Sequence, residues 1–180
     1  MFRSRLGVWL LIAGALALCG SIAFVVAASQ GISLKPGDVA PPIEGVDQHG
    51  NLVKLEAFRG QRNVVLYFYP ADGTPGCTAQ ACSLRDGYRE IGNAGAVVIG
   101  VSADSASSHA KFAARHNLPF SILPDPEHVM IRRYGVGMPL IGISRRVTFI
   151  VGRDGVIRDV ITNARTKDHD RQVLEVLAKL

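Results

Sequence analysis

The stretch from Val64 to Arg89 most tightly constrains how this 180-residue chain can fold. It begins with an almost continuously apolar run, Val64 to Tyr69, which is typical of a strand buried on both faces. A turn rich in Pro and Gly follows, and then a predicted helix over residues 74–91 that carries Cys77 and Cys82. A strand that runs through such a turn into a cysteine-bearing helix indicates thiol chemistry at the helix N-terminus.

Strand and helix patterns alternate along the rest of the chain. Two hairpins are expected, at residues 43–55 and at 146–162, where Arg153-Asp154-Gly155 supplies the turn of the second. Further strands are predicted at 96–101 and 120–123, and helices at 107–117, 127–134 and 168–180. This order predicts an α/β fold, with a mixed central sheet and helices on both faces.

The N-terminal run over residues 6–28 has no charged side chain. At 1.5 Å per residue, a helix of this length would span roughly 34 Å, enough to cross a bilayer core. Arg3 and Arg5 precede the run, and Lys35 is the first positive charge after it. That asymmetry predicts a membrane anchor with the catalytic domain on the extracytoplasmic, periplasmic side.

A signal segment cleaved near Ala28 is the alternative, and the protein would then be secreted. The expected organisation is an anchor or signal segment at 1–28, a linker at 29–42 and a domain at 43–180. Cys19 lies inside the apolar run and is interpreted as a small lipid-facing residue rather than a lipidated one.

The charge pattern argues against nucleic-acid binding. The chain has 20 Lys and Arg against 15 Asp and Glu, a net charge of +5, and its basic residues are scattered. The histidines follow no metal-ligand spacing, so no metal or other cofactor is expected. His109 and His116, seven residues apart, are interpreted as surface residues of one helix.

Cys77 falls in the first turn of the predicted helix, with Thr74 as N-cap and Pro75 at the first position. Free amide groups and the helix dipole favour negative charge there, so the reactive thiolate is favoured. The Thr74 hydroxyl can both cap the helix and donate to a molecule that approaches Cys77. An inert, buried Cys77 is the alternative interpretation.

The spacing of Pro70, Thr74 and Cys77 after the apolar strand resembles the active-site motif of the peroxiredoxins. Residues 68–70, 74–78 and 81–86 resemble the Q-type, bacterioferritin-comigratory subfamily, as does Cys82 five positions after Cys77. Arg146-Val147-Thr148-Phe149 resembles the strand that carries the family's active-site arginine. The resemblance covers residues 34–180.

This resemblance implies a thioredoxin-like fold and a thiol peroxidase for hydrogen peroxide and organic hydroperoxides. It implies that Cys77 is the peroxidatic cysteine, that Thr74 hydrogen-bonds the peroxide, and that Pro70 shields the pocket. Arg146 would stabilise the thiolate, and Cys82 would resolve the Cys77 sulfenic acid as an intramolecular disulfide. Thioredoxin or a thioredoxin-like protein is the expected reductant, and an internal resolving cysteine is compatible with a monomer.

Three features qualify this prediction. Arg145 could compete with Arg146, but strand alternation lets only one face the pocket, and the register to Thr148 favours Arg146. Gln80 stands where the subfamily commonly has Glu. In an intact helix, residues five apart lie roughly 8–9 Å apart at Cα, beyond the limit of about 7 Å for a disulfide, so the helix must unwind for Cys82 to reach Cys77.

A membrane-tethered thiol-disulfide oxidoreductase is the alternative function. That chemistry usually uses two cysteines separated by two residues, whereas four residues separate Cys77 from Cys82. The spacing therefore favours peroxide reduction.

Overall fold

A five-stranded mixed sheet forms the centre of the computed structural model, which describes residues 32–138 and 140–180. The strand order is β5-β4-β3-β8-β9, with β3, β4 and β5 parallel to one another and β8 and β9 antiparallel to their neighbours. The strands are β3 (Asn63–Phe68), β4 (Ala96–Ser102), β5 (Ser121–Pro124), β8 (Val147–Val151) and β9 (Ile157–Ile161).

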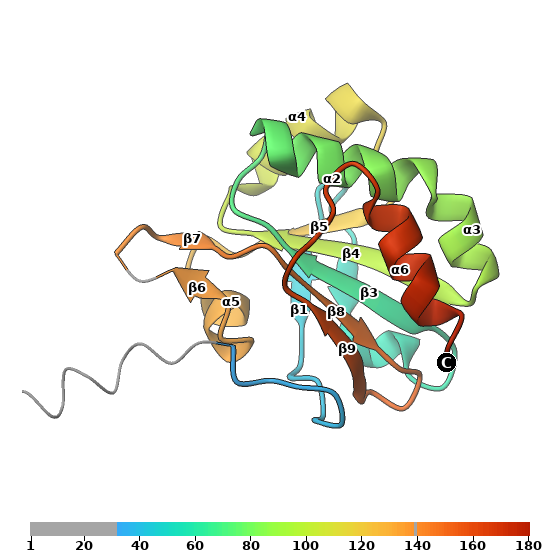
Figure 1. Cartoon of the computed structure of the whole chain (residues 1–180). Helices are drawn as coiled ribbons and strands as arrows, with labels where there is room; N and C mark the ends of the chain where they lie inside the picture. Colours follow the sequence, from blue (N-terminus) through green and yellow to red (C-terminus); the bar gives the residue numbers. More distant parts are fainter. Residues whose placement is uncertain (1–31, 139) are drawn as a thin grey trace, which may run out of the picture. The chain divides into compact units, whose positions relative to one another are not determined.

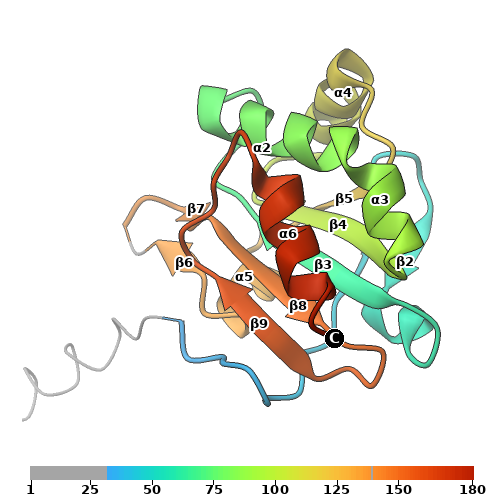
Figure 2. The same ribbon diagram turned by 45° about the vertical axis from the view of Figure 1, so that its right-hand side comes forward.

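Helices cover both faces of this sheet, as predicted, but unequally (Figures 1 and 2). One face carries α2 (Pro75–Asp86), α3 (Tyr88–Asn93), α4 (Ala106–His116) and α6 (His169–Leu177). The other face is covered by α5 (Val129–Arg133), the short 3-10 helix η1 (Leu55–Phe58) and the chain around the hairpin of β1 (Glu44–Val46) and β2 (Leu52–Lys54).

The central strand β3 is buried on both faces, as its apolar run predicts. Leu66 and Phe68 pack into the core on the α5 side, whereas Val65 and Tyr67 pack under α2 and α4. Because Phe68 pairs with Val147 in antiparallel register, the end of β3 lies beside the start of β8. This pairing brings Arg146, just before β8, to the loop that follows β3.

The compact unit starts at Ile32, so the described part of the predicted linker belongs to the domain. Ala40 is buried in the core, and Val39 forms a β-bridge with Val156. The Tyr134 hydroxyl donates to the Pro41 carbonyl at 2.7 Å. These contacts attach the segment before β1 to the domain.

The predicted membrane or signal segment and Cys19 lie outside the described residues. Across positions 32–138 and 140–180, no helix combines the length and the apolar character needed to cross a bilayer.

The single helix predicted over residues 74–91 is wrong in one respect: it is broken at Gly87 into α2 and α3. The reason is tertiary. Ser83 Oγ donates to Asp170 Oδ1 at 2.6 Å, and α6 approaches so closely at Gly87 that a side chain there would collide with Asp170. Two further elements were not predicted: η1, and a small hairpin of β6 (Gly137–Met138) and β7 (Ile143–Ser144) that projects from the sheet in Figure 1.

The Gly87→Ala substitution tests this close approach. A Cβ at Gly87 would lie 2.5 Å from Cβ of Asp170, so α6 must shift. We expect the free energy of unfolding to fall by about 1–3 kcal/mol, measured by urea denaturation. Gly92→Ala in α3 is the matched control, because a Cβ there meets no described atom within 4 Å. Equal stability of the two variants would contradict the packing explanation.

Candidate active site

Cys77 occupies the third position of α2, where the helix begins. The first intrahelical hydrogen bond runs from the Thr78 amide to the Thr74 carbonyl at 2.9 Å, so the amides of Gly76 and Cys77 precede it. Such free amides and the helix dipole stabilise negative charge on a thiol at this position. The side chain is only 1% exposed, which limits access by bulky reagents. The sulfur is a free thiol.

The guanidinium of Arg146 contacts the sulfur of Cys77. Its Nη2 donates to Cys77 Sγ at 3.4 Å, and its Nη1 donates to Gln80 Oε1 at 2.5 Å. Gly76 leaves room for this approach, because a Cβ at that position would lie a tight 3.1 Å from Nη2. Among the described residues no carboxylate forms an ion pair with Arg146. The guanidinium charge is therefore directed at the thiol without a neutralising partner.

Gln80 is fully buried and uses only half of its amide. Its Oε1 accepts from Arg146, whereas its Nε2 has no hydrogen-bond partner among the described residues. A neutral side chain thus fixes the orientation of the arginine. The predicted competitor, Arg145, has no described contact with Cys77; its backbone amide donates to the Val136 carbonyl at 2.7 Å.

Thr74 stands at the N-cap position but does not cap the helix with its side chain, contrary to expectation. Its hydroxyl donates to the Ala71 carbonyl at 3.2 Å instead. With its proton used in this way, the exposed oxygen keeps lone pairs that can accept a hydrogen bond from an incoming O–H group. Pro70 lies two residues after the end of β3 and is half-buried at the start of the same loop.

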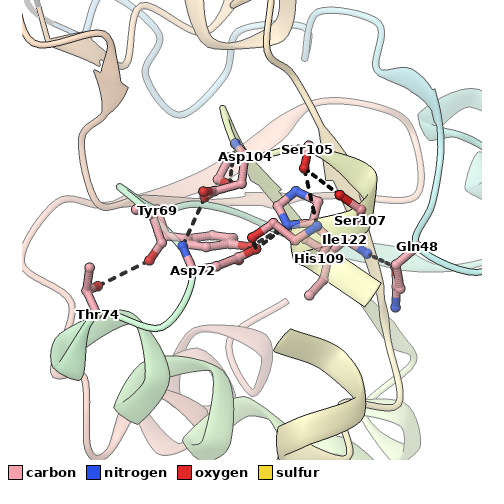
Figure 3. Close-up of polar contacts among 12 residues, drawn as sticks. Gln48, Tyr69, Asp72, Thr74, Asp104, Ser105, Ser107, His109 and Ile122 are labelled. Atoms are coloured by element: carbon pink, nitrogen blue, oxygen red, sulfur yellow. Dashed lines mark hydrogen bonds and ion pairs between the residues drawn. The ribbon is translucent and has the colours of Figure 1, made fainter. Parts of the chain in front are cut away.

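A buried polar network fixes the loop between Pro70 and Thr74 (Figure 3). The Asp72 carboxylate accepts from the Tyr69 hydroxyl at 2.7 Å, from Ser108 Oγ at 2.7 Å and from His109 Nδ1 at 2.9 Å. Burial alone would raise the pKa of Asp72, but these hydrogen bonds outweigh it and hold the pKa below its usual range. Burial raises the pKa of Tyr69, so its hydroxyl stays protonated and donates.

The network also ties the loop to the end of β4. The Asp72 amide donates to Asp104 Oδ2 at 2.9 Å, and the same oxygen accepts from Ser102 Oγ of β4 at 2.7 Å. Sequence reasoning missed it. His109 was interpreted as a surface residue, whereas its side chain is completely buried. The three-residue spacing of His109 and Phe112, on the face that packs on the sheet, is the signal that would have indicated burial.

Cys82 lies away from this cluster, further along the unbroken helix α2. It is a half-buried free thiol, and its Sγ lies 3.9 Å from Nδ1 of His116 at the end of α4. The structure therefore brings Cys77, Gln80 and Arg146 together, places Thr74 and Pro70 on the adjoining loop, and leaves Cys82 with a different neighbour.

Comparison with known proteins identifies the family. Residues 36–160 match the model of the AhpC/TSA family. The chain is 41% identical over 146 residues to the chloroplastic peroxiredoxin Q of Sedum lineare, covering 80% of this chain and 78% of the relative. It is 39% identical over 153 residues to peroxiredoxin Bcp of Bacillus subtilis, covering 81% of this chain and 96% of the relative.

A solved structure has the same fold. The crystal structure of peroxidoxin BcpB from Mycobacterium tuberculosis superposes with a TM-score of 0.76 at 32% identity, covering 82% of this chain and 98% of that one. This match confirms the predicted thioredoxin-like peroxiredoxin fold. The chain therefore belongs to the AhpC/TSA family, in its peroxiredoxin Q/Bcp subfamily, and is a thiol peroxidase, an oxidoreductase.

Proposed function

We propose that Cys77 is the peroxidatic cysteine and that it reduces hydrogen peroxide and organic hydroperoxides. The observation that carries this proposal is the 3.4 Å contact between Arg146 Nη2 and Cys77 Sγ at the start of α2. A guanidinium is always charged and presents several donors in a fixed fork. It can therefore stabilise the thiolate and also the negative charge that develops on the peroxide oxygens during attack.

In the first step the Cys77 thiolate attacks one peroxide oxygen and the O–O bond breaks. The sulfur becomes a sulfenic acid, and the leaving oxygen takes up a proton to depart as water or an alcohol. Thr74 accepts a hydrogen bond from the peroxide O–H through the lone pairs that its contact with Ala71 leaves free. Pro70 shields the sulfur from bulk water at the start of the loop.

In the second step Cys82 attacks the oxidised sulfur of Cys77. An S–S bond forms, the S–O bond breaks and water leaves. Both cysteines belong to the unbroken helix α2, in which residues five apart lie roughly 8–9 Å apart at Cα and point about 140° apart. A disulfide needs Cα atoms within about 7 Å, so the start of α2 unwinds during each turnover.

The disulfide is then reduced by thioredoxin or by a thioredoxin-like protein. An internal resolving cysteine needs no second chain, which is compatible with a monomer. Residues 6–28 anchor the protein in a membrane with the catalytic domain on the extracytoplasmic side, or are removed as a signal segment. The charge asymmetry around that run supports this topology. A reporter fused to the C-terminus tests it, since cytoplasmic reporter activity would overturn the orientation.

A membrane-tethered thiol-disulfide oxidoreductase is the alternative function. Its disulfide would have to form without unwinding, which the placement of Cys77 and Cys82 in one continuous helix disfavours. Insulin reduction without peroxide consumption would support this alternative.

One experiment tests the proposed cycle as a whole. The full-length reduced protein is treated with one equivalent of hydrogen peroxide and its free thiols are alkylated. Mass spectrometry is expected to show an internal Cys77–Cys82 link. A species joined between two chains, with no internal link, would rule out the cycle.

A further inference from the structure

The C-terminal half of α2, which carries Cys82, lies beside basic side chains other than the Arg146 that contacts Cys77. His116, the last residue of α4, places Nδ1 3.9 Å from Cys82 Sγ. Its ring packs edge-on against the buried ring of Phe112, with centroids 5.1 Å apart, so packing sets the position of the imidazole. The ring is half-buried and lines a hollow of about 190 Å³, through which it can exchange protons with water.

Side-chain contacts hold this half of α2 in place on both sides. Ser83 Oγ donates to Asp170 Oδ1 of α6 at 2.6 Å and accepts from the Asp170 amide at 3.0 Å. Arg85 Nη1 donates to the His116 carbonyl at 2.8 Å. The half that carries Cys77 is instead held by Arg146. Because these contacts hold the C-terminal half of α2, its first turns are the part that moves when the helix unwinds. Cys77 then moves towards Cys82, which stays beside His116.

We propose that His116 is the proton acceptor that activates Cys82 for its attack on the sulfenic acid of Cys77. This inference rests on the proposed function, because it assigns a base to the resolving step. The Cys82 S–H proton moves to Nδ1 of His116, and the resulting thiolate forms the S–S bond. The S–O bond breaks, and the departing hydroxide takes the proton from the imidazolium, directly or through water, to leave as water.

The charges around His116 suit this role. His116 lies at the C-terminus of α4, where the helix dipole stabilises the positive charge that forms during proton transfer. On α2, Arg85 bonds Asp86 at 2.8 Å; this bond chiefly raises the pKa of Arg85, with smaller contributions from Cys82. The other charged groups that line the hollow are Lys111 and Arg115 on α4 and Asp72 opposite.

The test follows the two steps separately in the full-length His116→Gln variant, in single turnovers without reductant. A sulfenic-acid trap measures the oxidation of Cys77, and mass spectrometry of quenched samples measures the Cys77–Cys82 disulfide. We expect unchanged oxidation of Cys77 and disulfide formation at least about tenfold slower at pH 7. The deficit should shrink above about pH 8.5, where thiols ionise without a base, and added imidazole should partly restore the rate.

His49→Gln is the matched control, since His49 is exposed and only its backbone amide bonds Asp47. A His116→Gln rate equal to wild type, or one lowered by the same factor at every pH, would overturn the role of His116 while leaving the proposed cycle intact. Absence of the internal disulfide in the wild-type protein would instead overturn the cycle itself, and the inference with it.

Discussion

Cys77→Ser is expected to abolish peroxide reduction, with a loss of about a thousandfold or more in the rate of peroxide consumption. A serine hydroxyl at the start of α2 stays protonated at neutral pH, so neither the helix N-terminus nor Arg146 has a thiolate to stabilise. The measurement is consumption of hydrogen peroxide by the full-length protein with a thioredoxin-type reductant. Because Cys77 is 1% exposed and surrounded by the core under β3, folding of the variant is checked by circular dichroism.

Cys82→Ser is the control that separates the two cysteines. It should consume one equivalent of peroxide at the wild-type rate and then stop, because the Cys77 sulfenic acid forms but is not resolved internally. Retention of substantial activity by Cys77→Ser would remove Cys77 from the role of nucleophile. Loss of the first equivalent in Cys82→Ser would show that Cys82 takes part in the oxidation step.

The local part of the site was readable from the sequence. Short sequence patterns predict three features: the apolar run of β3, the turn after it and the start of α2 at Thr74-Pro75. They do so because strand burial and helix initiation depend on neighbouring residues. Arg146 could be placed only through the family resemblance. It lies 69 positions from Cys77, and the contact depends on the antiparallel pairing of β3 with β8, which no local pattern specifies.

Two of the missed features depend on tertiary contacts, and the third depends on a local acceptor. The break at Gly87 exists because Asp170 of α6 approaches there, and periodicity alone continues the helix through it. His109 is buried because a carboxylate from a distant loop, Asp72, meets its ring. The side-chain cap expected at Thr74 is absent, and its hydroxyl instead donates to the Ala71 carbonyl three residues earlier. In each case a partner distant in sequence or a competing acceptor decides the outcome.

Arg146→Gln is expected to slow the oxidation of Cys77 by about a hundredfold, because it removes the charge and the donor closest to the reacting sulfur. Stopped-flow measurement of the first turnover gives this rate directly. Arg146→Lys should lose less, since it keeps the charge but cannot bond Gln80 and Cys77 at once with a planar fork. Arg145→Gln is the matched control, and its rate should equal wild type. A slow Arg145 variant beside a normal Arg146 variant would reverse the assignment.

The Gln80→Glu substitution separates two contributions of Arg146 to the reaction: its positive charge and its fixed orientation. The substitution keeps an oxygen for Nη1, so the fork stays oriented, but it adds a negative charge beside the guanidinium. If the unneutralised charge of Arg146 drives the reaction, this variant should be slower near neutral pH and its rate profile should move to higher pH, because the thiolate is less stabilised. If orientation alone matters, the rate should not fall. The pH profile of the first turnover therefore decides whether Arg146 acts on Cys77 by its charge or by its position.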